Sequence, residues 1–203
     1  MTEEFYKIKQ AQELYRTCWN IYPKLLKRIE LKKTDKILDA GCGNGELAKH
    51  LKGFNLWGFD SDKNAVENAK KQDYKKVVLG DIYKIPFKDK EFDKTICIEV
   101  LEYLSNPEKT LKELVRVSKN EVIISCANFN WYRINSFLSK EMREQYKEQI
   151  ESNGNFINSG FFKKLAGKNN LKLKIIYISN RFEFVRNLFG NFFASEVIGI
   201  FSP

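Results

Sequence analysis

The chain has 203 residues, of which 43% are hydrophobic and 30% charged. This length suits one domain with a sizeable core, and the composition is that of a globular protein and excludes wholesale disorder. We expect no secretory signal, because the first ten residues are charged, and no membrane span, because no apolar run approaches ~20 residues. Four separated cysteines and one histidine argue against a zinc site and favour reduced thiols in the cytoplasm.

The formal net charge is +9. One interpretation is a surface that binds nucleic acid or an anionic substrate. The other is that lysine is simply the common surface residue of this protein. Lysines are spread along the chain among acidic residues, without an arginine-rich run or a basic tail, and this distribution favours the second interpretation while leaving nucleic acid as a possible partner.

The first residues of the chain have a helical pattern. Between residues 3 and 30, apolar and aromatic side chains recur at helical spacing. We therefore predict an N-terminal helical cap over residues 1–33.

Short apolar runs then alternate with amphipathic stretches. The predicted strands are Lys36–Ala40, Asn55–Asp60, Lys76–Gly80, Phe92–Ile98, Glu121–Cys126, Leu171–Ser179 and Glu196–Phe201. The predicted helices are Glu46–Lys52, Asp62–Gln72, Pro107–Ser118 and Phe161–Asn169, the last with Ser159 as a possible cap. The alternation predicts βαβ units, and hence a mainly parallel sheet with helices on both faces. Ligands of such sheets bind beyond the carboxyl ends of the strands, so the residues after each strand are the candidates for a site.

A glycine loop follows the first predicted strand, in the stretch Asp39-Ala-Gly41-Cys-Gly43-Asn-Gly45-Glu46. Glycines allow positive φ and let a ligand approach the backbone. A dinucleotide fingerprint would need a third glycine where Glu46 stands, and a carboxylate there would oppose a pyrophosphate. A Walker A motif is also absent. The acidic loop instead suits a ligand with ammonium and sulfonium charges, such as S-adenosylmethionine.

The second predicted strand ends at Asp60, and this carboxylate is placed to accept hydrogen bonds from a ribose diol. The alternative is that Asp60, Ser61 or Asp62 only caps the following helix. Since Ser61 or Asp62 suffices as a cap, we favour ribose binding by Asp60.

The third and fourth strand ends carry further candidates. Asp81 could accept from an adenine amine while Ile82 lies against the ring; the alternative is a turn aspartate with core neighbours. Ile98 and Glu99 end the fourth predicted strand opposite the glycine loop, where Glu99 could orient the aminoacyl end of the ligand or face the substrate.

Four stretches resemble, in order, the motifs of class I S-adenosylmethionine-dependent methyltransferases of the methyltransferase-11 type. These are ILDAGCGNGELAKHL, WGFDSD, VVLGDIYKIPF and FDKTICIEVLEYLSNPEKTLKEL, over roughly residues 36–127. The resemblance implies a single doubly wound, Rossmann-like domain with a seven-stranded, mostly parallel sheet of order 3-2-1-4-5-7-6. It also implies a cofactor site made of Asp39, Gly41, Cys42, Gly43, Asn44, Gly45, Asp60, Ser61, Asp81, Ile82, Ile98 and Glu99.

A closer resemblance extends to residues 117–133 and 187–197, which look like the methionine-biosynthesis W-type (MetW-like) methyltransferases. The chain departs from that group in its longer N-terminal helical segment and in the sequence Ile-Glu-Val-Leu-Glu-Tyr after the fourth strand.

Substrate choice is predicted to lie with the insertion at residues 128–160 and with the N-terminal helices. Both contain aromatic and amide side chains, which could bind a planar or anionic substrate or simply form the core of a lid: Tyr15, Trp19, Asn128, Phe129, Asn130, Trp131, Tyr132 and Arg133. His50 is expected to face away from the site, and no residue is singled out as a general base.

Three functions remain open from the sequence. The first is methylation of a small molecule, which we favour. The second is methylation of RNA or protein through the basic surface. The third is a cofactor-binding regulatory partner without catalysis. No metal ion, membrane partner or particular oligomeric state is indicated.

Overall fold

The computed structural model describes residues 21–135, 137, 140, 143, 144, 147, 155, 157–178 and 194–203. The chain divides into two compact units, Met1–Leu31 and Lys32–Pro203. In the first unit, helix α2 spans Ile21–Leu26, and the helices predicted before residue 21 lie outside the described residues.

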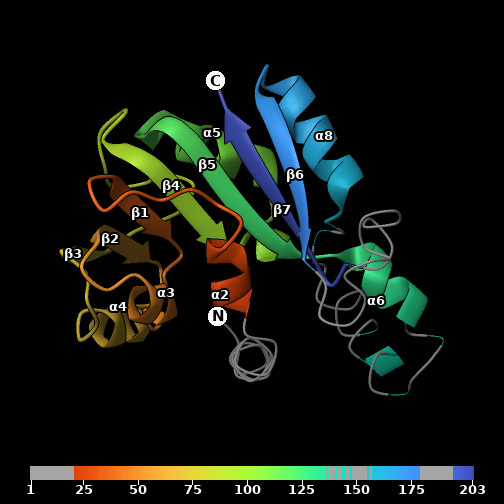
Figure 1. The fold of residues 1–203 in the computed structure, drawn as a ribbon, viewed down its shortest axis with the longest axis horizontal. Coiled ribbons are helices and arrows are strands. Elements are labelled where there is room, and N and C mark those ends of the chain that lie inside the picture. The colour runs from red at the N-terminus through yellow and green to blue at the C-terminus, as the bar shows by residue number, and fades with distance from the viewer. Residues whose placement is uncertain are drawn as a thin grey trace. The chain divides into compact units, whose positions relative to one another are not determined.

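The second unit is built on a seven-stranded sheet of order β3-β2-β1-β4-β5-β7-β6 (Figure 1). Its strands are β1 (Lys36–Ala40), β2 (Asn55–Asp60), β3 (Lys76–Leu79), β4 (Phe92–Ile98), β5 (Ser118–Ala127), β6 (Lys172–Ile178) and β7 (Glu196–Ser202). Strands β1 to β5 pair in parallel, and β7 lies antiparallel between β5 and β6. The predicted fold class and strand order are confirmed.

The helices of this unit are α3 (Glu46–His50), α4 (Lys63–Ala69), η1 (Leu101–Tyr103), α5 (Pro107–Val117), α6 (Phe129–Asn135) and α8 (Ser159–Lys168). Asn106 caps α5 and Pro107 follows it, as the sequence predicts. The predicted cap of α8 is wrong. The helix begins one residue earlier than that cap would allow, since Ser159 is already helical. The cap is Asn158, which has extended backbone and whose side chain accepts from the Phe161 N–H.

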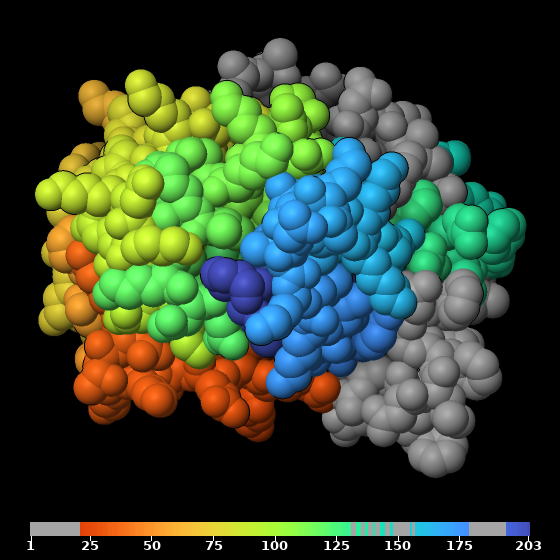
Figure 2. Space-filling view, turned by 90° about the horizontal axis from the view of Figure 1, so that it is seen from above, coloured from red at the N-terminus to blue at the C-terminus, as the bar shows by residue number. Residues whose placement is uncertain are grey.

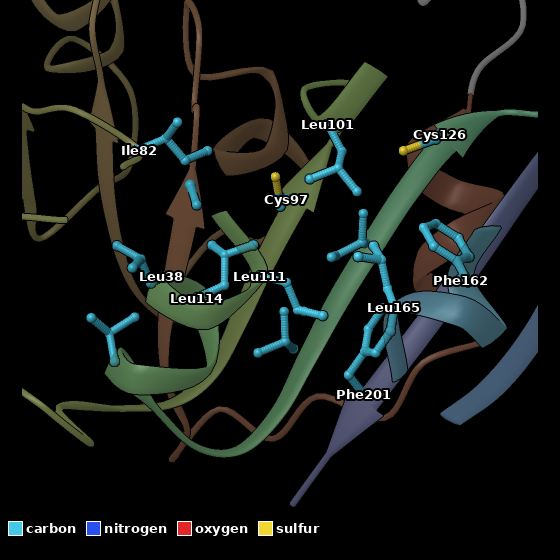
Figure 3. Packing of buried hydrophobic residues seen from close by; sticks show 14 of the residues in the cluster. Leu38, Ile82, Cys97, Leu101, Leu111, Leu114, Cys126, Phe162, Leu165 and Phe201 are labelled. Carbon is cyan, nitrogen blue, oxygen red and sulfur yellow. The ribbon is translucent and has the colours of Figure 1, made fainter. Parts of the chain in front are cut away.

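The two faces of the sheet carry different helices. Leu111 and Leu114 of α5 pack on one face of the sheet, together with Phe162 and Leu165 of α8. All four belong to the main core cluster and are labelled in Figure 3. On the opposite face, α4 contributes to a smaller cluster through Val66 and Ala69. The sheet is therefore covered on both faces, and its carboxyl edge remains as the place where loops from β1, β2 and β4 meet.

Ion pairs join the elements at the amino edge of the sheet, onto which Figure 2 looks. They are Lys36–Glu91, Lys94–Glu121, Lys119–Asp93 and the pairs of Arg116 with Asp89 and Glu113. Part of the positive charge of the chain is thus paired locally with acids, in keeping with the interpretation of lysine as an ordinary surface residue.

Candidate functional site

The candidate site lies where the strand order reverses. Strand β1 pairs with β2 on one side and with β4 on the other, so the loops after β1 and β4 leave the sheet in opposite directions. In doubly wound sheets this switch point is where a ligand can enter between the loops. The structure brings the predicted loop after β1 and the ends of β2 and β4 to this place.

The glycine loop is held against the ends of its two neighbouring strands. The N–H groups of Gly41 and Cys42 both donate to the Phe59 carbonyl, each over 3.0 Å. Gly41 has φ +77°, and a Cβ at this position would lie 2.7 Å from a methyl carbon of Val100. A side chain at residue 41 would therefore push Val100, which follows β4, away from the loop.

Asp60 joins the end of β2 to the glycine loop. Its Oδ2 accepts from the Gly43 N–H over 2.8 Å and its Oδ1 accepts from the Asp62 N–H over 2.9 Å. Asp62 caps α4 through the Asn64 N–H, so the capping role falls to Asp62 and not to Asp60. A carboxylate has about four acceptor positions, which leaves Asp60 capacity for further donors.

Gly43 is a partly buried turn residue of the loop. It has φ +52°, and no atom lies within 4 Å of the position that its Cβ would take. The conformation favours glycine, while the space in front of it is open. Gly43 therefore presents bare backbone beside Asp60.

Asp39 and Gly45 face the other side of the loop. Asp39 is buried on β1, and its Oδ2 accepts a 2.6 Å hydrogen bond from the Tyr74 hydroxyl. A Cβ on Gly45 would approach Ala69, Gln72 and Tyr74 within 3.1 Å. The absence of a side chain at Gly45 thus lets the segment after α4 pack closely against the loop. The sequence analysis missed Tyr74, which stands in a lysine-rich stretch without a motif of its own.

Glu99 lies at the β4 side of the site, directly after the strand. It is buried, it has φ +55°, and its N–H donates to the Ser125 carbonyl over 2.8 Å. Such a backbone is unfavourable for a residue with a side chain and is commonly found at functional positions. Ile98, the residue before it, is buried as the last residue of β4.

Cys126 lies near two buried carboxylates. Burial raises the pKa of its thiol well above the ordinary value, and the negative charges of Glu102 and Glu99 raise the pKa further. The sulfur therefore stays protonated and does not act as a nucleophile. Glu102 lies on η1, where the Asn155 N–H donates to its carbonyl over 2.7 Å, so residue 155 is tied to the segment that follows β4.

Asp81 and Ile82 have the contacts of a turn. The Asp81 carboxylate accepts from the Tyr83 N–H over 2.8 Å, and Ile82 is buried in the main core cluster. Two further candidates, Asn44 and Ser61, are exposed, and the Asn44 side chain accepts from the amide of Asn68 on α4. Adenine binding by Asp81 and Ile82 stays a prediction.

The candidates for substrate choice are only partly described. Asn128 is buried and its amide donates to the Ala194 carbonyl over 2.8 Å, which gives it a structural role. Arg133 is exposed, and Tyr15 and Trp19 lie outside the described residues, as do the side chains of Trp131 and Tyr132. His50 is exposed on α3 with its Nε2 3.8 Å from Glu46, so it takes no part in the geometry of the site.

Within the described ranges, no three histidine, cysteine or acidic side chains are grouped so that they could hold a metal ion. No helix in that part of the chain is long and apolar enough to cross a membrane. Asp39 accepts from a phenol and Asp60 from two backbone N–H groups, and these donors carry no charge. An acidic site with donors of this kind suits a ligand that carries positive charge and hydroxyl donors.

This fold, with its inserted antiparallel strand, is the Rossmann-like methyltransferase fold. Similar chains in solved structures include a SAM-dependent methyltransferase from Thermotoga maritima, with a TM-score of 0.74 and 18% identity over 100% of this chain and 99% of the other. Another is magnesium protoporphyrin IX methyltransferase from Synechocystis with bound SAM, with a TM-score of 0.56 and 18% identity over 83% of this chain and 70% of the other.

Residues 38–126 match the family described as "Methyltransferase domain". An uncharacterized protein of Methanocaldococcus jannaschii is 39% identical over 97 residues, which are 48% of this chain and 42% of the relative. An uncharacterized methyltransferase of Schizosaccharomyces pombe is 34% identical over 112 residues, 47% of this chain and 40% of the relative. The matched stretch thus spans less than half the length of either relative.

Proposed function

We propose that this chain is an S-adenosylmethionine-dependent methyltransferase that acts on a small-molecule acceptor. The observation that carries the proposal is the pairing of the Gly43 N–H with the Asp60 carboxylate beside open space at the switch point. This pairing places an acid beside a glycine turn without a side chain, and a ligand with a ribose and a cationic amino-acid end would contact both. The match of residues 38–126 to a methyltransferase domain supports it.

Each part of the ligand then has a candidate partner. Asp60 would accept from the ribose hydroxyls, and Asp39 with the glycine loop would hold the methionine moiety. Asp81 and Ile82 would contact the adenine, and Ile98 and Glu99 would lie near the sulfonium. The remaining candidates, Cys42, Asn44 and Ser61, would line the same loop and strand end. The buried carboxylates at the ends of β1 and β4 fit a cationic ligand better than a phosphate.

When bound, S-adenosylmethionine supplies an electrophilic methyl group on a sulfonium, and transfer to a nucleophile neutralises the charge. The chain would contribute alignment and the exclusion of water. A general base is required only if the acceptor must lose a proton. The raised pKa of Cys126 removes that thiol as a base at neutral pH.

We further propose that residues 128–160 and the cap at 1–33 select the acceptor, within one methyltransferase domain that acts in the cytoplasm. The hydrogen bonds of Asn155 to the η1 segment support this role, because they tie the insertion to the residues that follow β4. The MetW-like motifs at 117–133 and 187–197 support membership of that subgroup.

Binding can be tested on the purified chain by calorimetry and thermal shift with S-adenosylmethionine and S-adenosylhomocysteine. NAD⁺ and ATP serve as controls, because both carry adenosine with phosphates. We expect heat and a raised melting temperature with the first two ligands alone. A response to NAD⁺ or ATP, and to neither of the first two, would overturn the proposal.

The acceptor can be found by incubating a cell extract with the chain and methyl-labelled cofactor, then separating small molecules, RNA and protein. Label in small molecules supports the proposal. A second candidate, methylation of RNA, is favoured by the exposed lysines of α8 and β6, among them Lys163, Lys164 and Lys174. Label in RNA would select it, and cofactor binding without label in any fraction would indicate a regulatory partner.

A further inference from the structure

A tyrosine behind the glycine loop contacts the buried acid of β1. Tyr74 lies between α4 and β3, on a segment whose Lys75 N–H donates to the Leu56 carbonyl over 2.7 Å. Its hydroxyl donates to Asp39 over 2.6 Å, at the short end of the range for a phenol and a carboxylate. The contact links a residue outside every recognised motif to a candidate cofactor residue.

Two glycines make room for the Tyr74 ring. A Cβ on Gly45 would lie 3.1 Å from its Cε2, and a Cβ on Gly58 would lie 3.0 Å from its Cε1. Gly45 belongs to the loop and Gly58 to β2, so opposite edges of the ring touch both elements. Tyr74 is therefore restrained by packing on two sides before its hydroxyl reaches Asp39.

We propose that Tyr74 is a positioning residue for the amino-acid end of the cofactor. With one oxygen of Asp39 bound by the phenol, the carboxylate keeps one orientation beside the glycine loop. Orientation fixed before binding lowers the entropy lost on binding. The inference rests on the proposed function, because it takes the ligand to carry an ammonium group.

The proposal predicts a loss that depends on the ligand. S-Adenosylhomocysteine has the amino-acid end, whereas 5′-methylthioadenosine keeps the adenosine and the thioether but lacks that end. Tyr74→Phe removes only the hydroxyl and keeps the ring between Gly45 and Gly58. We expect it to weaken S-adenosylhomocysteine binding about 5- to 20-fold, less than the loss of a charge-assisted hydrogen bond made directly to the ligand, and to leave 5′-methylthioadenosine nearly unchanged.

The experiment is calorimetry with both ligands on the wild type, Tyr74→Phe, Asp39→Asn and the double variant. Tyr177→Phe is the matched control, because Tyr177 lies on β6 at the far edge of the sheet. In the Asp39→Asn background, Tyr74→Phe should cost little further affinity for S-adenosylhomocysteine, since the charged carboxylate that the hydroxyl orients is absent.

Equal weakening of both ligands in Tyr74→Phe, or of neither, would overturn the positioning role while leaving the proposed function intact. A wild type that binds neither ligand would overturn both. If Tyr74→Phe does not fold, the outcome rests on Asp39→Asn alone: unchanged selectivity between the two ligands contradicts the proposal, and a selective loss for S-adenosylhomocysteine supports it.

Discussion

Two aspartates with nearly the same local geometry stand at opposite edges of the sheet. Asp60, at the carboxyl edge, accepts from two backbone N–H groups over 2.8 and 2.9 Å. Asp93, at the amino edge, accepts from the Lys36 N–H over 2.8 Å and from the Lys119 ammonium over 2.9 Å. The Lys119 hydrogen bond, the Lys36 N–H and the charge of both lysines lower the pKa of Asp93.

The difference lies in the charge of the donors. At the amino edge, lysines neutralise the carboxylates and hold neighbouring strands together. At the carboxyl edge, two backbone N–H groups orient Asp60 and add no positive side chain beside it. The same residue type thus serves stability at one edge and is placed for binding at the other. Variants at the two edges should accordingly separate stability from binding.

The largest effect on binding is expected for Gly43→Val. A valine at φ +52° is strained, and its side chain would fill the open space beside Asp60. Binding of S-adenosylhomocysteine should be lost within the range of calorimetry. Gly53→Val is the control, because Gly53 also has positive φ and open space but lies after α3, away from the site. If Gly43→Val keeps its affinity for S-adenosylhomocysteine, the glycine loop does not contact this ligand.

Asp60→Ala should weaken S-adenosylhomocysteine binding by ~1.5–3 kcal/mol, through loss of hydrogen bonds to the charged acceptor. Asp93→Ala is matched in geometry and should leave the affinity unchanged while lowering the stability. Isothermal titration of both variants compares the two edges directly. Equal affinity in Asp60→Ala and the wild type would remove Asp60 from the site.

Arg116→Met tests the stability of the amino edge. The guanidinium donates to both oxygens of Glu113 and to the carbonyls of Ile85 and Phe87, so it fixes the connection between β3 and β4. Its removal should lower the free energy of unfolding by about 2 kcal/mol, because several charged hydrogen bonds are lost while the apolar stem remains. Urea denaturation measures this loss. An unchanged free energy of unfolding would mean that water replaces the hydrogen bonds of Arg116 without loss of stability.

The smallest effect is expected for the acid dependence of stability. The pKa of Asp93 is lower in the folded chain than its ordinary value of 3.8, so its contribution is complete well above that value and is lost as the pH falls through the lowered pKa. Between about pH 5 and pH 2, the free energy of unfolding of Asp93→Asn should fall less than that of the wild type, by a difference under ~1 kcal/mol. Glu91 and Glu113 have lowered pKa values for similar reasons and should preserve the remaining slope. A steeper acid dependence in Asp93→Asn would contradict this assignment.

The local sequence pattern alone predicted most of the strands and helices. The bounds of β1, β2 and β4 agree with the prediction, because the apolar residues of each strand stop at a glycine or an acidic residue: Gly41, Asp60 and Glu99. The cap of α8 was misplaced by one residue, because serine and asparagine are both good caps and only the backbone conformation distinguishes them. β5 begins three residues before the predicted Glu121, because its pairing with β4 extends to Phe92 and Ser118.

The sequence by itself determined the succession of strands and helices along the chain and the glycine turn with acids at successive strand ends, since these depend on periodicity and on residues close together in the chain. Only the tertiary structure decided which groups those acids contact. Tyr74 reaches Asp39 across 35 positions, and Val100 meets Gly41 across the sheet. Contacts of this kind depend on how β1, β2 and β4 pack side by side, and no local pattern carries that information.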